Sequence, residues 1–464
     1  MFGIPDRLKK HMPLLAACVA VVILFVIFSA HLTDNGIRRG IKIENTDVSG
    51  MAPEKARRLL RSNVNSSYPQ GMFSLEYGGR TWEFGLNEIS YRFLVDDAVD
   101  KAYSVGRSGG FFSRLFGASS LLVNQLTLRV ENSFDPDRVA EILAGIKNQV
   151  DKEPLNSTVS YVSGKIEKQP GSDGLRLSID RNLKLVENHL RERAFQGIDL
   201  SVDVVRPAIP YEEVGEIDTV LSSFSTVFNA GDVNRSDNIR LACSKLDGRI
   251  LLPGEEFSMN DTLGPRTIEN GYKEAPVIYM NELIPGPGGG ICQVTTTLYD
   301  AILLAKLGIL ERSHHSMPLG YVKPGQDATI AEDSIDFKFR NSTDYAVCLS
   351  ATVSGNRINI RVLGRKAPEV QKVKLVSEVL AEYPPGKDEI EIDDSLADGE
   401  RVVVKEARRG LRVALYRETY AESGDLLERE RISEDYYKPS DGLVKMNRNY
   451  YDIYVSIMKG SENE

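Results

Sequence analysis

Residues 286–309 read GPGGGICQVTTTLYDAILLAKLGI, and this stretch decides the fold of the region around it. Gly288, Gly289 and Gly290 can adopt backbone angles that are closed to other residues, and they let a ligand approach the main chain closely. Apolar residues then recur with helical spacing. The pattern predicts a loop that passes directly into a helix, with Cys292 at the junction.

A cysteine at the start of a helix lies where its thiolate is favoured. Unpaired backbone N–H groups and the positive end of the helix dipole both stabilise the anion. The same N–H groups can stabilise an oxyanion, so one glycine-rich turn can supply both the nucleophile and the donors for acyl transfer. We therefore treat Cys292 as the candidate nucleophile. Gly289, Gly290 and Gln293 are candidate substrate contacts, the last through its N–H or its side-chain amide.

Two adjacent histidines, His314 and His315, follow the predicted helix. An imidazole beside a thiol can take its proton and later return it to a leaving amine. Asp327 and Asp336 each lie on a later strand-like stretch, and either carboxylate can orient the imidazole. The choice between them stays open, as does the alternative that Cys292 is an inert buried thiol.

The other three cysteines, Cys18, Cys243 and Cys348, form no CxxC pair and no other metal-ligand spacing. We therefore predict neither a metal site nor a cofactor. Cys243 lies in an apparent helix and Cys348 in an apparent strand, as small core residues do. A disulfide between them stays open, because its geometry cannot be read from the sequence.

The length and charge of the chain limit its domain number and its partners. A chain of 464 residues is long enough for about three domains. Its formal net charge of −9 is spread over segments of mixed sign, without a broad basic surface. This distribution argues against nucleic acid as the main partner.

An apolar stretch near the N-terminus predicts a membrane anchor. The run LLAACVAVVILFVIFSA follows Arg7, Lys9 and Lys10, and it approaches the roughly 20 residues that span a bilayer. We expect a cytoplasmic tail at 1–11 and an uncleaved signal anchor at 12–31. Because positive charge precedes the span, the bulk of the chain is expected outside the cell membrane, as a single-pass protein.

Strand, turn and helix units recur between residues 41 and 205, which predicts an α+β region. In one unit, DPDRVAEILAGIKNQV reads as a helix with Asp135 as its N-cap and Pro136 at its first position. The region resembles the peptidoglycan-binding domain that often precedes L,D-transpeptidases in Gram-positive bacteria, through NTDVSGMAPEKA, TWEF and VDDAVDKAYSVGRSGG. The resemblance implies that it binds peptidoglycan.

The rest of the chain predicts further domains. We expect a linker, a catalytic-type domain, an all-β module and a tail, at residues 206–220, 221–365, 371–450 and 451–464. The all-β module is similar to the small wall-protein module named for its five glycines, which implies polysaccharide contact. The predicted fold class is multidomain α+β, with an α/β or α+β catalytic-type domain.

The stretch from about Phe224 to Gly364 is similar to the VanW family. The phrases that carry the likeness are LPGEEFSMNDTLGPRTIENGYKEAPVI, PGPGGGICQVTTTLYDAILLAKLGILER, HSMPLGYVKPGQDATI and IDFKFRNSTDY. The resemblance implies a cysteine-dependent L,D-transpeptidase, in which Cys292 attacks the carbonyl after meso-diaminopimelate in a tetrapeptide stem. D-Alanine leaves, and an amine of a neighbouring stem takes the acyl group. His315 matches the usual histidine of the family, whereas His314 stands at a variable position.

Arg266 and Asn260 lie in the first of these phrases. Arg266 can grip a carboxylate of the stem by a bidentate contact. The alternative is a purely structural loop that both residues hold together. His314 is also kept as a candidate substrate contact.

Two interpretations of function remain open. The first is a cell-wall acyltransferase, most simply an L,D-transpeptidase, or else a carboxypeptidase or amidase. The second is a non-catalytic accessory protein that binds peptidoglycan or serves an antibiotic response. In both, the expected partners are peptidoglycan stem peptides and glycan, together with the membrane.

Overall fold

The computed structural model describes residues 14–22, 25, 35–68, 71–107, 124–279, 282–332, 334–365 and 372–461. Two compact units divide the chain, and each contains two segments: Met1–Glu153 with Gly174–Val205, and Pro154–Asp173 with Arg206–Glu464. Of the predicted anchor at 12–31, only residues 14–22 and 25 are described, as helix, and the remainder lies outside the described residues. Within the described ranges, no helix has the length and apolar character needed to cross a membrane.

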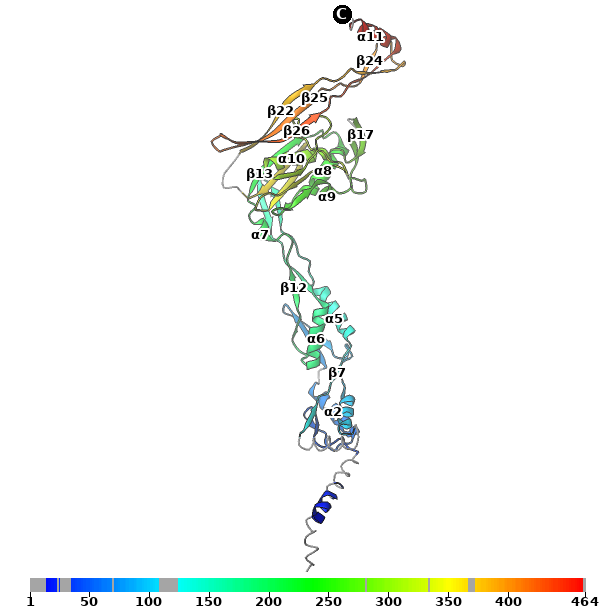
Figure 1. Ribbon diagram of the computed structural model, residues 1–464, viewed down its shortest axis with the longest axis vertical. Helices are drawn as coiled ribbons and strands as arrows, with labels where there is room; N and C mark the ends of the chain where they lie inside the picture. Colours follow the sequence, from blue (N-terminus) through cyan, green and yellow to red (C-terminus); the bar gives the residue numbers. More distant parts are fainter. Residues whose placement is uncertain are drawn as a thin grey trace, which may run out of the picture. The chain divides into compact units, whose positions relative to one another are not determined.

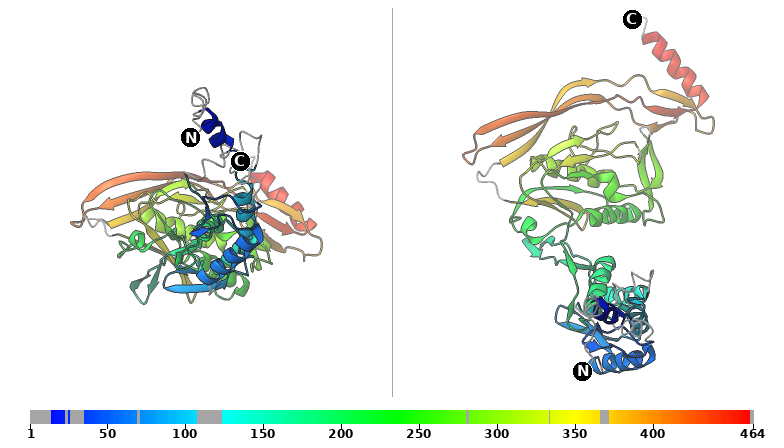
Figure 2. Two further views of the ribbon diagram at one scale, coloured as in Figure 1. Left: turned by 90° about the horizontal axis from the view of Figure 1, so that it is seen from below. Right: turned by 60° about the horizontal axis from the view of Figure 1, so that its bottom comes forward.

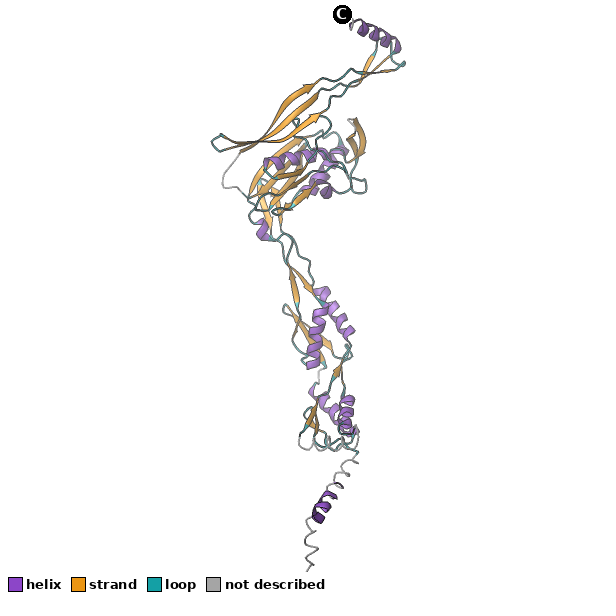
Figure 3. Cartoon of the chain, in the orientation of Figure 1, coloured by secondary structure: helices purple, strands orange, loops and turns teal. Residues whose placement is uncertain are grey.

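The first unit contains two hydrophobic cores, each formed by two helices on short strands (Figure 3). One core joins α2 and α3 to the sheet β2-β1-β6, and the other joins α5 and α6 to the sheet β11-β3-β4. The elements of this unit are β1 (Ile41–Ile43), β2 (Thr46–Asp47), α2 (Pro53–Ser67), β3 (Met72–Tyr77), β4 (Arg80–Gly85), β5 (Arg92–Phe93), α3 (Val95–Ser104), β6 (Leu126–Leu128), β7 (Asn132–Ser133), α5 (Pro136–Val150), β10 (Gly174–Leu177), α6 (Ile179–Glu192), β11 (Ile198–Asp199) and β12 (Val202–Val205).

Helix α5 begins where the local sequence predicted. The Asp135 side chain accepts a hydrogen bond from the Asp137 N–H at 3.1 Å, and Pro136 occupies the first turn, where its missing N–H does no harm. The buried residues of the helix recur at intervals of three and four: Val139, Leu143, Ile146 and Val150. The predicted cap and the amphipathic pattern are both confirmed.

The second unit is centred on helix α10, which lies between two antiparallel sheets (Figure 1). One sheet has the order β13-β21-β20-β14, and the other has the order β22-β25-β26, whose strands are Lys372–Tyr383, Gly410–Tyr420 and Leu426–Tyr437. The elements that build this part are α7 (Tyr211–Val214), β13 (Thr219–Val227), α8 (Val233–Leu246), β14 (Ile250–Leu251), β15 (Glu256–Ser258), α9 (Met259–Leu263), β16 (Glu274–Tyr279), β17 (Glu282–Pro287), α10 (Ile291–Leu304), β18 (Gly308–Glu311), β19 (Lys338–Arg340), β20 (Val347–Ser354) and β21 (Arg357–Gly364).

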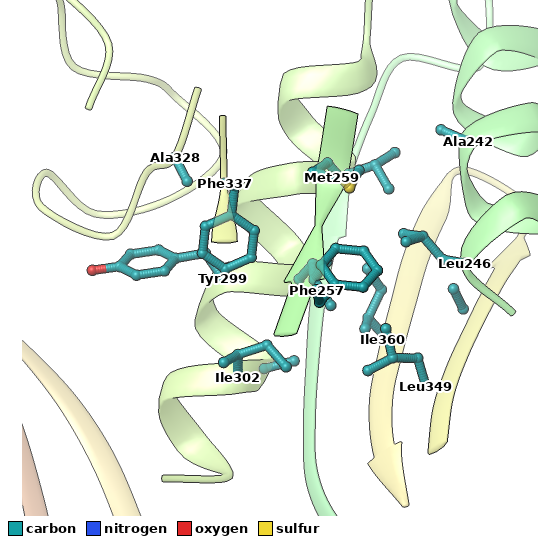
Figure 4. Packing of buried hydrophobic residues seen from close by; sticks show 14 of the residues in the cluster. Ala242, Leu246, Phe257, Met259, Tyr299, Ile302, Ala328, Phe337, Leu349 and Ile360 are labelled. Atoms are coloured by element: carbon teal, nitrogen blue, oxygen red, sulfur yellow. The ribbon is translucent and has the colours of Figure 1, made fainter. Parts of the chain in front are cut away.

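Helix α10 is buried on all sides, although it carries Gln293, three threonines and Asp300 besides its apolar residues. Its core neighbours include Phe257, Phe337 and Leu349, and the Tyr299 ring meets the Phe337 ring edge-on at 5.7 Å (Figure 4). The threonines of the VTTT run are satisfied internally. Thr295 and Thr297 donate to carbonyls one turn back in the helix, and Thr296 exchanges hydrogen bonds with the backbone of Ala328.

Residues 372–446 form an all-β module, referred to below as the β module. It consists of the long sheet β22-β25-β26 and the smaller sheet β23-β27-β24, and helix α11 follows it at the C-terminal end (Figure 2). Its elements are β22 (Lys372–Tyr383), β23 (Glu389–Ile392), β24 (Arg401–Lys405), β25 (Gly410–Tyr420), β26 (Leu426–Tyr437) and β27 (Leu443–Met446), and the helix is α11 (Arg448–Ser461). The multidomain α+β architecture with an all-β module agrees with the sequence-based expectation, whereas part of the predicted tail is helical.

The hairpin of β8 (Thr158–Val162) and β9 (Lys165–Gln169) belongs to the second unit, although it was expected within the region at 41–205. Val159 is buried in a small core with residues of β14, β20 and β21. The Cys348 thiol lies 3.6 Å from the Val159 carbonyl. All four cysteines are free thiols, so the Cys243–Cys348 disulfide is not formed.

The burial of α10 generates a stability prediction. Leu298 is fully buried, so Leu298→Ala is expected to lower the free energy of unfolding of the second unit by about 2–5 kcal/mol, through lost burial and an unfilled cavity. Native-state hydrogen exchange of the α10 amides measures the change. Leu310→Ala is the control, because that side chain is 45% exposed and should change stability by no more than about 0.5 kcal/mol. Equal effects of the two variants would contradict the central position of α10.

Candidate active site

The turn before α10 contains glycines at positions where any side chain would force neighbouring atoms to move. Gly290 is the N-cap residue, with a left-handed φ of 102°. A Cβ at this position would lie 2.9 Å from Cγ of Arg235, and a Cβ on Gly289 would lie 2.7 Å from the Pro276 carbonyl. The turn therefore packs directly against α8 and against β16 of the hairpin that precedes it.

Cys292 lies in the first turn of α10 and is partly exposed. The N–H groups of Ile291 and Gln293 donate to the carbonyls of Gly288 and Gly290. The Cys292 N–H has no acceptor among the described residues. One donor at the positive end of the helix dipole is therefore free beside the thiol, as the sequence pattern predicted.

His315 and Asp327 lie together in the interior, close to the thiol. The Nδ1 atom of His315 is 2.8 Å from Oδ2 of Asp327, and the His315 backbone N–H donates to the same oxygen at 2.6 Å. Both side chains are buried. Because Asp327 fixes Nδ1 as a donor, the other ring nitrogen is left for the thiol.

The Cys292 thiol and the His315 imidazole form an ion pair near neutral pH. Burial raises the pKa of the Cys292 thiol, but hydrogen bonding to His315 and the charge of His315 outweigh it and bring the pKa down to about 7. Burial lowers the pKa of His315, but its hydrogen bonds to Asp327 and Cys292 outweigh that and raise the pKa to about 9. Between these values the thiol is deprotonated while the imidazole is protonated, and each charge stabilises the other.

Asp327 and not Asp336 contacts the imidazole. Burial raises the pKa of Asp327, yet the donors around it outweigh that penalty and the pKa is lowered. Asp336 instead accepts hydrogen bonds from the Ser258 hydroxyl at 2.6 Å and from the Asn260 N–H at 2.9 Å. Its role is to fix the start of α9, away from His315.

A pocket of about 820 Å³ opens beside the thiol. Arg235, Arg266 and Glu332 are the charged residues that line it beside Cys292 and His315. Its wall otherwise combines the glycine turn with apolar and aromatic residues, among them Val277, Pro287, Met317, Leu319, Tyr321, Ile330 and Ile335. A ligand with both anionic and cationic groups on an apolar frame suits these surroundings.

Other residues predicted for the site have mainly structural partners. The Asn260 amide donates to the Ile335 carbonyl at 3.0 Å and accepts from Arg266 at 2.8 Å, so these two residues hold a loop, although Arg266 also lines the pocket. The Gln293 amide donates to the Thr226 hydroxyl and the Val227 carbonyl and accepts from Arg235, which leaves no side-chain donor for an oxyanion. The His314 Nδ1 lies 2.6 Å from the carbonyl of the next residue, His315, and the ring meets that of Tyr437 edge-on at 5.1 Å, outside the pocket wall.

The sequence reasoning missed Arg235, Tyr321, Arg312 and Tyr437. Tyr321 lies in the phrase that contains His315, so its place beside the site had a signal in the sequence. Arg235 belongs to α8, and Tyr437 lies at the end of β26; no local pattern connects them with Cys292. Among the described residues, no group of His, Cys, Asp and Glu could hold a metal ion.

Comparison with known proteins decides the family. Residues 234–363 match the family described as "VanW like protein". The chain is also 31% identical over 227 residues to a Bacillus subtilis (strain 168) protein named "Uncharacterized protein YoaR", a match that covers 49% of this chain and 74% of that protein. The chain belongs to the VanW family. A further VanW-family relative is "Vancomycin B-type resistance protein VanW" of Enterococcus faecalis (strain ATCC 700802 / V583), 30% identical over 181 residues, with 38% of this chain and 66% of that protein covered.

Two further matches flank the VanW domain. Residues 82–199 match the family described as "Putative peptidoglycan binding domain", and residues 376–447 match the "G5 domain". Solved structures of the G5 domain of an IgA1 protease and of HP0197-G5 are 20% and 21% identical to this chain, with TM-scores of 0.12 and 0.11. Each covers 18% of this chain, and the matches include 96% and 100% of those structures. The chain is thus a VanW-like, cell-wall-associated protein, and all three predicted resemblances are confirmed.

The glycine turn can be tested by a pair of substitutions. Gly290→Ala introduces both a left-handed alanine and a clash with Arg235, whereas Gly254→Ala introduces only the strain, because its Cβ would meet nothing within 4 Å. We expect Gly290→Ala to destabilise the second unit by about 1–3 kcal/mol more than Gly254→Ala, and to slow alkylation of Cys292. Urea unfolding and iodoacetamide labelling measure the two effects. Equal stability of the variants would show that the turn tolerates displacement.

The ion pair predicts the pH dependence of thiol reactivity. The thiolate is the reactive form, so alkylation of Cys292 should rise with pH through a midpoint near 7, and His315→Asn should move that midpoint upward by removing the counter-charge. Mass spectrometry after alkylation of the full chain carrying Cys18→Ser measures the profile. Cys243 and Cys348 are internal controls, because burial raises the pKa of each to about 12 and they should react only after unfolding. A His315→Asn profile identical to that of the parent chain would exclude the pair.

Proposed function

We propose that this VanW-family protein is a cysteine-dependent acyltransferase of peptidoglycan stem peptides, and specifically an L,D-transpeptidase. The observation that carries the proposal is the Cys292–His315–Asp327 arrangement at the edge of a pocket. The three groups are the nucleophile, the acid–base and the orienting carboxylate that such chemistry requires. The proposal places the protein outside the cytoplasmic membrane, where peptidoglycan lies.

The acylation step follows from the charges of the couple. The Cys292 thiolate attacks the carbonyl carbon between diaminopimelate and D-alanine, and the oxyanion that forms lies near the free Cys292 N–H. The C–N bond then breaks, and D-alanine leaves as an amine that takes its proton from the His315 imidazolium. The product of this step is a thioester on Sγ, with His315 neutral.

The second step returns the enzyme to its starting state. An amine of a neighbouring stem attacks the thioester carbonyl, and neutral His315 accepts the proton that this amine loses. The C–S bond breaks as the new amide bond forms, and the thiolate–imidazolium pair is restored. If water replaces the amine, the same residues act as a carboxypeptidase, and the acceptor decides between the two outcomes.

The pocket charges support a stem peptide as the substrate. A diaminopimelate residue and a terminal D-alanine present carboxylates and an ammonium group on short aliphatic chains. Arg235 and Arg266 are suited to the carboxylates, and Glu332 is suited to the ammonium group. The match of residues 82–199 to a peptidoglycan-binding family agrees with the same substrate.

Purified tetrapeptide muropeptides test the proposal. The full chain is expected to release D-alanine, to gain the mass of a muropeptide lacking D-alanine on Cys292, and to form a cross-linked dimer. Cys292→Ala should abolish all three, and His315→Asn should slow D-alanine release by about 10²–10⁴-fold. Mass spectrometry of the protein and of the products measures them.

The outcomes separate the alternatives. A tripeptide product without a dimer would indicate a carboxypeptidase. Intact muropeptides that bind to the chain without releasing D-alanine would instead indicate a non-catalytic wall-binding protein. Asp336→Asn is a matched control for an Asp327→Asn variant, because Asp336 has no contact with His315 and only Asp327→Asn should impair turnover strongly.

A further inference from the structure

We infer that the β module is part of the active site, and that Tyr437 on its strand β26 is a positioning residue that holds Asp327 toward His315. The inference rests on the proposed function, since it concerns the same three groups. It assigns to this module a task within the reaction in addition to any contact with the cell wall.

The Tyr437 hydroxyl joins two points of the chain beside His315. It donates a hydrogen bond to Oδ1 of Asp327 at 2.5 Å and accepts one from the Gly325 N–H at 2.7 Å. Tyr437 is fully buried, and Asp327 is 1% exposed. Because water does not reach either group, a missing hydroxyl would leave a carboxylate oxygen and an amide N–H without partners.

A second residue of β26 acts on the same segment. Asp435 accepts a hydrogen bond from Arg312 at 2.6 Å. The same guanidinium donates to the backbone carbonyls of Asp327 at 2.8 Å and Gly325 at 3.1 Å, and the nitrogen that bonds Gly325 also lies 3.6 Å from Oδ1 of Asp327. Arg312 is therefore a buried cation that joins Asp435 of the β module to Gly325 and Asp327.

The other two strands of the long sheet complete the contact. The Ser377 hydroxyl on β22 donates to the Pro324 carbonyl. On β25, Val413 and Leu415 lie so close to Gly325 that a Cβ there would be 3.4 Å and 3.5 Å from them. All three strands thus meet the turn that leads into Asp327.

These contacts divide the donors of Asp327 into two sets. Oδ2 accepts both bonds from His315, whereas Oδ1 faces Tyr437 and Arg312. The carboxylate is thereby fixed against rotation, and one of its edges is presented to the imidazole. The titratable and charged groups that surround the Asp327–His315–Cys292 series are Arg235, Tyr299, Asp300, Arg312, Tyr321, Asp435 and Tyr437, together with His314, whose ring meets the Tyr437 ring edge-on at 5.1 Å.

Tyr436 offers a matched control on the same strand. Its side chain is 45% exposed and stacks edge-on with Tyr383 rather than entering the site. Tyr436→Phe and Tyr437→Phe therefore remove the same hydroxyl from adjacent positions. Only the second removes a partner of Asp327.

The experiment is the pH profile of Cys292 alkylation in the full chain, combined with steady-state D-alanine release from tetrapeptide muropeptides. For Tyr437→Phe we expect the midpoint near 7 to move upward by about one pH unit, because a loosely held Asp327 supports the imidazolium less well. The kcat at pH 7 should fall about tenfold, while KM changes less than about twofold. Tyr436→Phe should match the parent chain. Identical profiles for Tyr437→Phe and Tyr436→Phe would overturn the inference.

A second variant guards against a folding defect. If Tyr437→Phe exposes Cys243 and Cys348 to alkylation, the unit has unfolded, and Ser377→Ala is measured in its place. An upward shift of the Cys292 midpoint in Ser377→Ala supports the inference, and an unchanged midpoint overturns it. The two proposals fail separately. If the parent chain releases no D-alanine but Tyr437→Phe shifts the alkylation midpoint, the positioning role is supported and the transpeptidase proposal is refuted. If the parent chain releases D-alanine but the midpoint does not shift, the transpeptidase proposal is supported and the positioning role is refuted.

Discussion

The constraint on which the second unit depends is the nearly complete burial of helix α10. Twelve of its fourteen residues are buried, so every face needs a neighbour, and these are supplied by β13, β21, α8, β18 and β22. Its threonines and Gln293 have hydrogen-bond partners inside the protein, whereas the buried Asp300 carboxyl has none among the described residues, and burial raises its pKa well above the usual value. The first turn of α10 is the exception. There the pocket reaches the helix, and there Cys292 lies.

The three cysteines of the second unit show how partners decide the chemistry of one residue type. Burial raises the pKa of the Cys243 and Cys348 thiols to about 12, and the negative charge of Asp247 acts in the same direction. Burial raises the pKa of the Cys292 thiol as well, yet its pKa is about 7 because His315 donates a hydrogen bond and supplies the opposite charge. The imidazolium depends in turn on Asp327, and the carboxylate on the hydroxyl and guanidinium behind it. The reactive thiol is thus the end of a series of buried polar groups.

The sequence predicted those features that local patterns determine. The glycine turn, the helix after it and the cap at Asp135 each follow from residues within a few positions of one another, and the structure contains all of them. The choice between Asp327 and Asp336 could not be made in this way, because both follow similar stretches and only the path of the chain brings one of them to His315. Arg235 and Tyr437 could not be predicted either, because only the path of the chain brings them to the site. The segment 154–173 was expected in the first unit but belongs to the second, because no local sequence pattern shows that a chain leaves one unit and later returns to it.

The position of Tyr437 in the chain has a consequence for biosynthesis. It follows Asp327 by 110 residues, so the nucleophile, the imidazole and the carboxylate all leave the ribosome well before the strand that completes their surroundings. A nascent or prematurely terminated chain would contain the thiol without the buried hydroxyl and counter-ion that its partners need. The order of synthesis therefore delays a fully assembled site until strand β26 has been made.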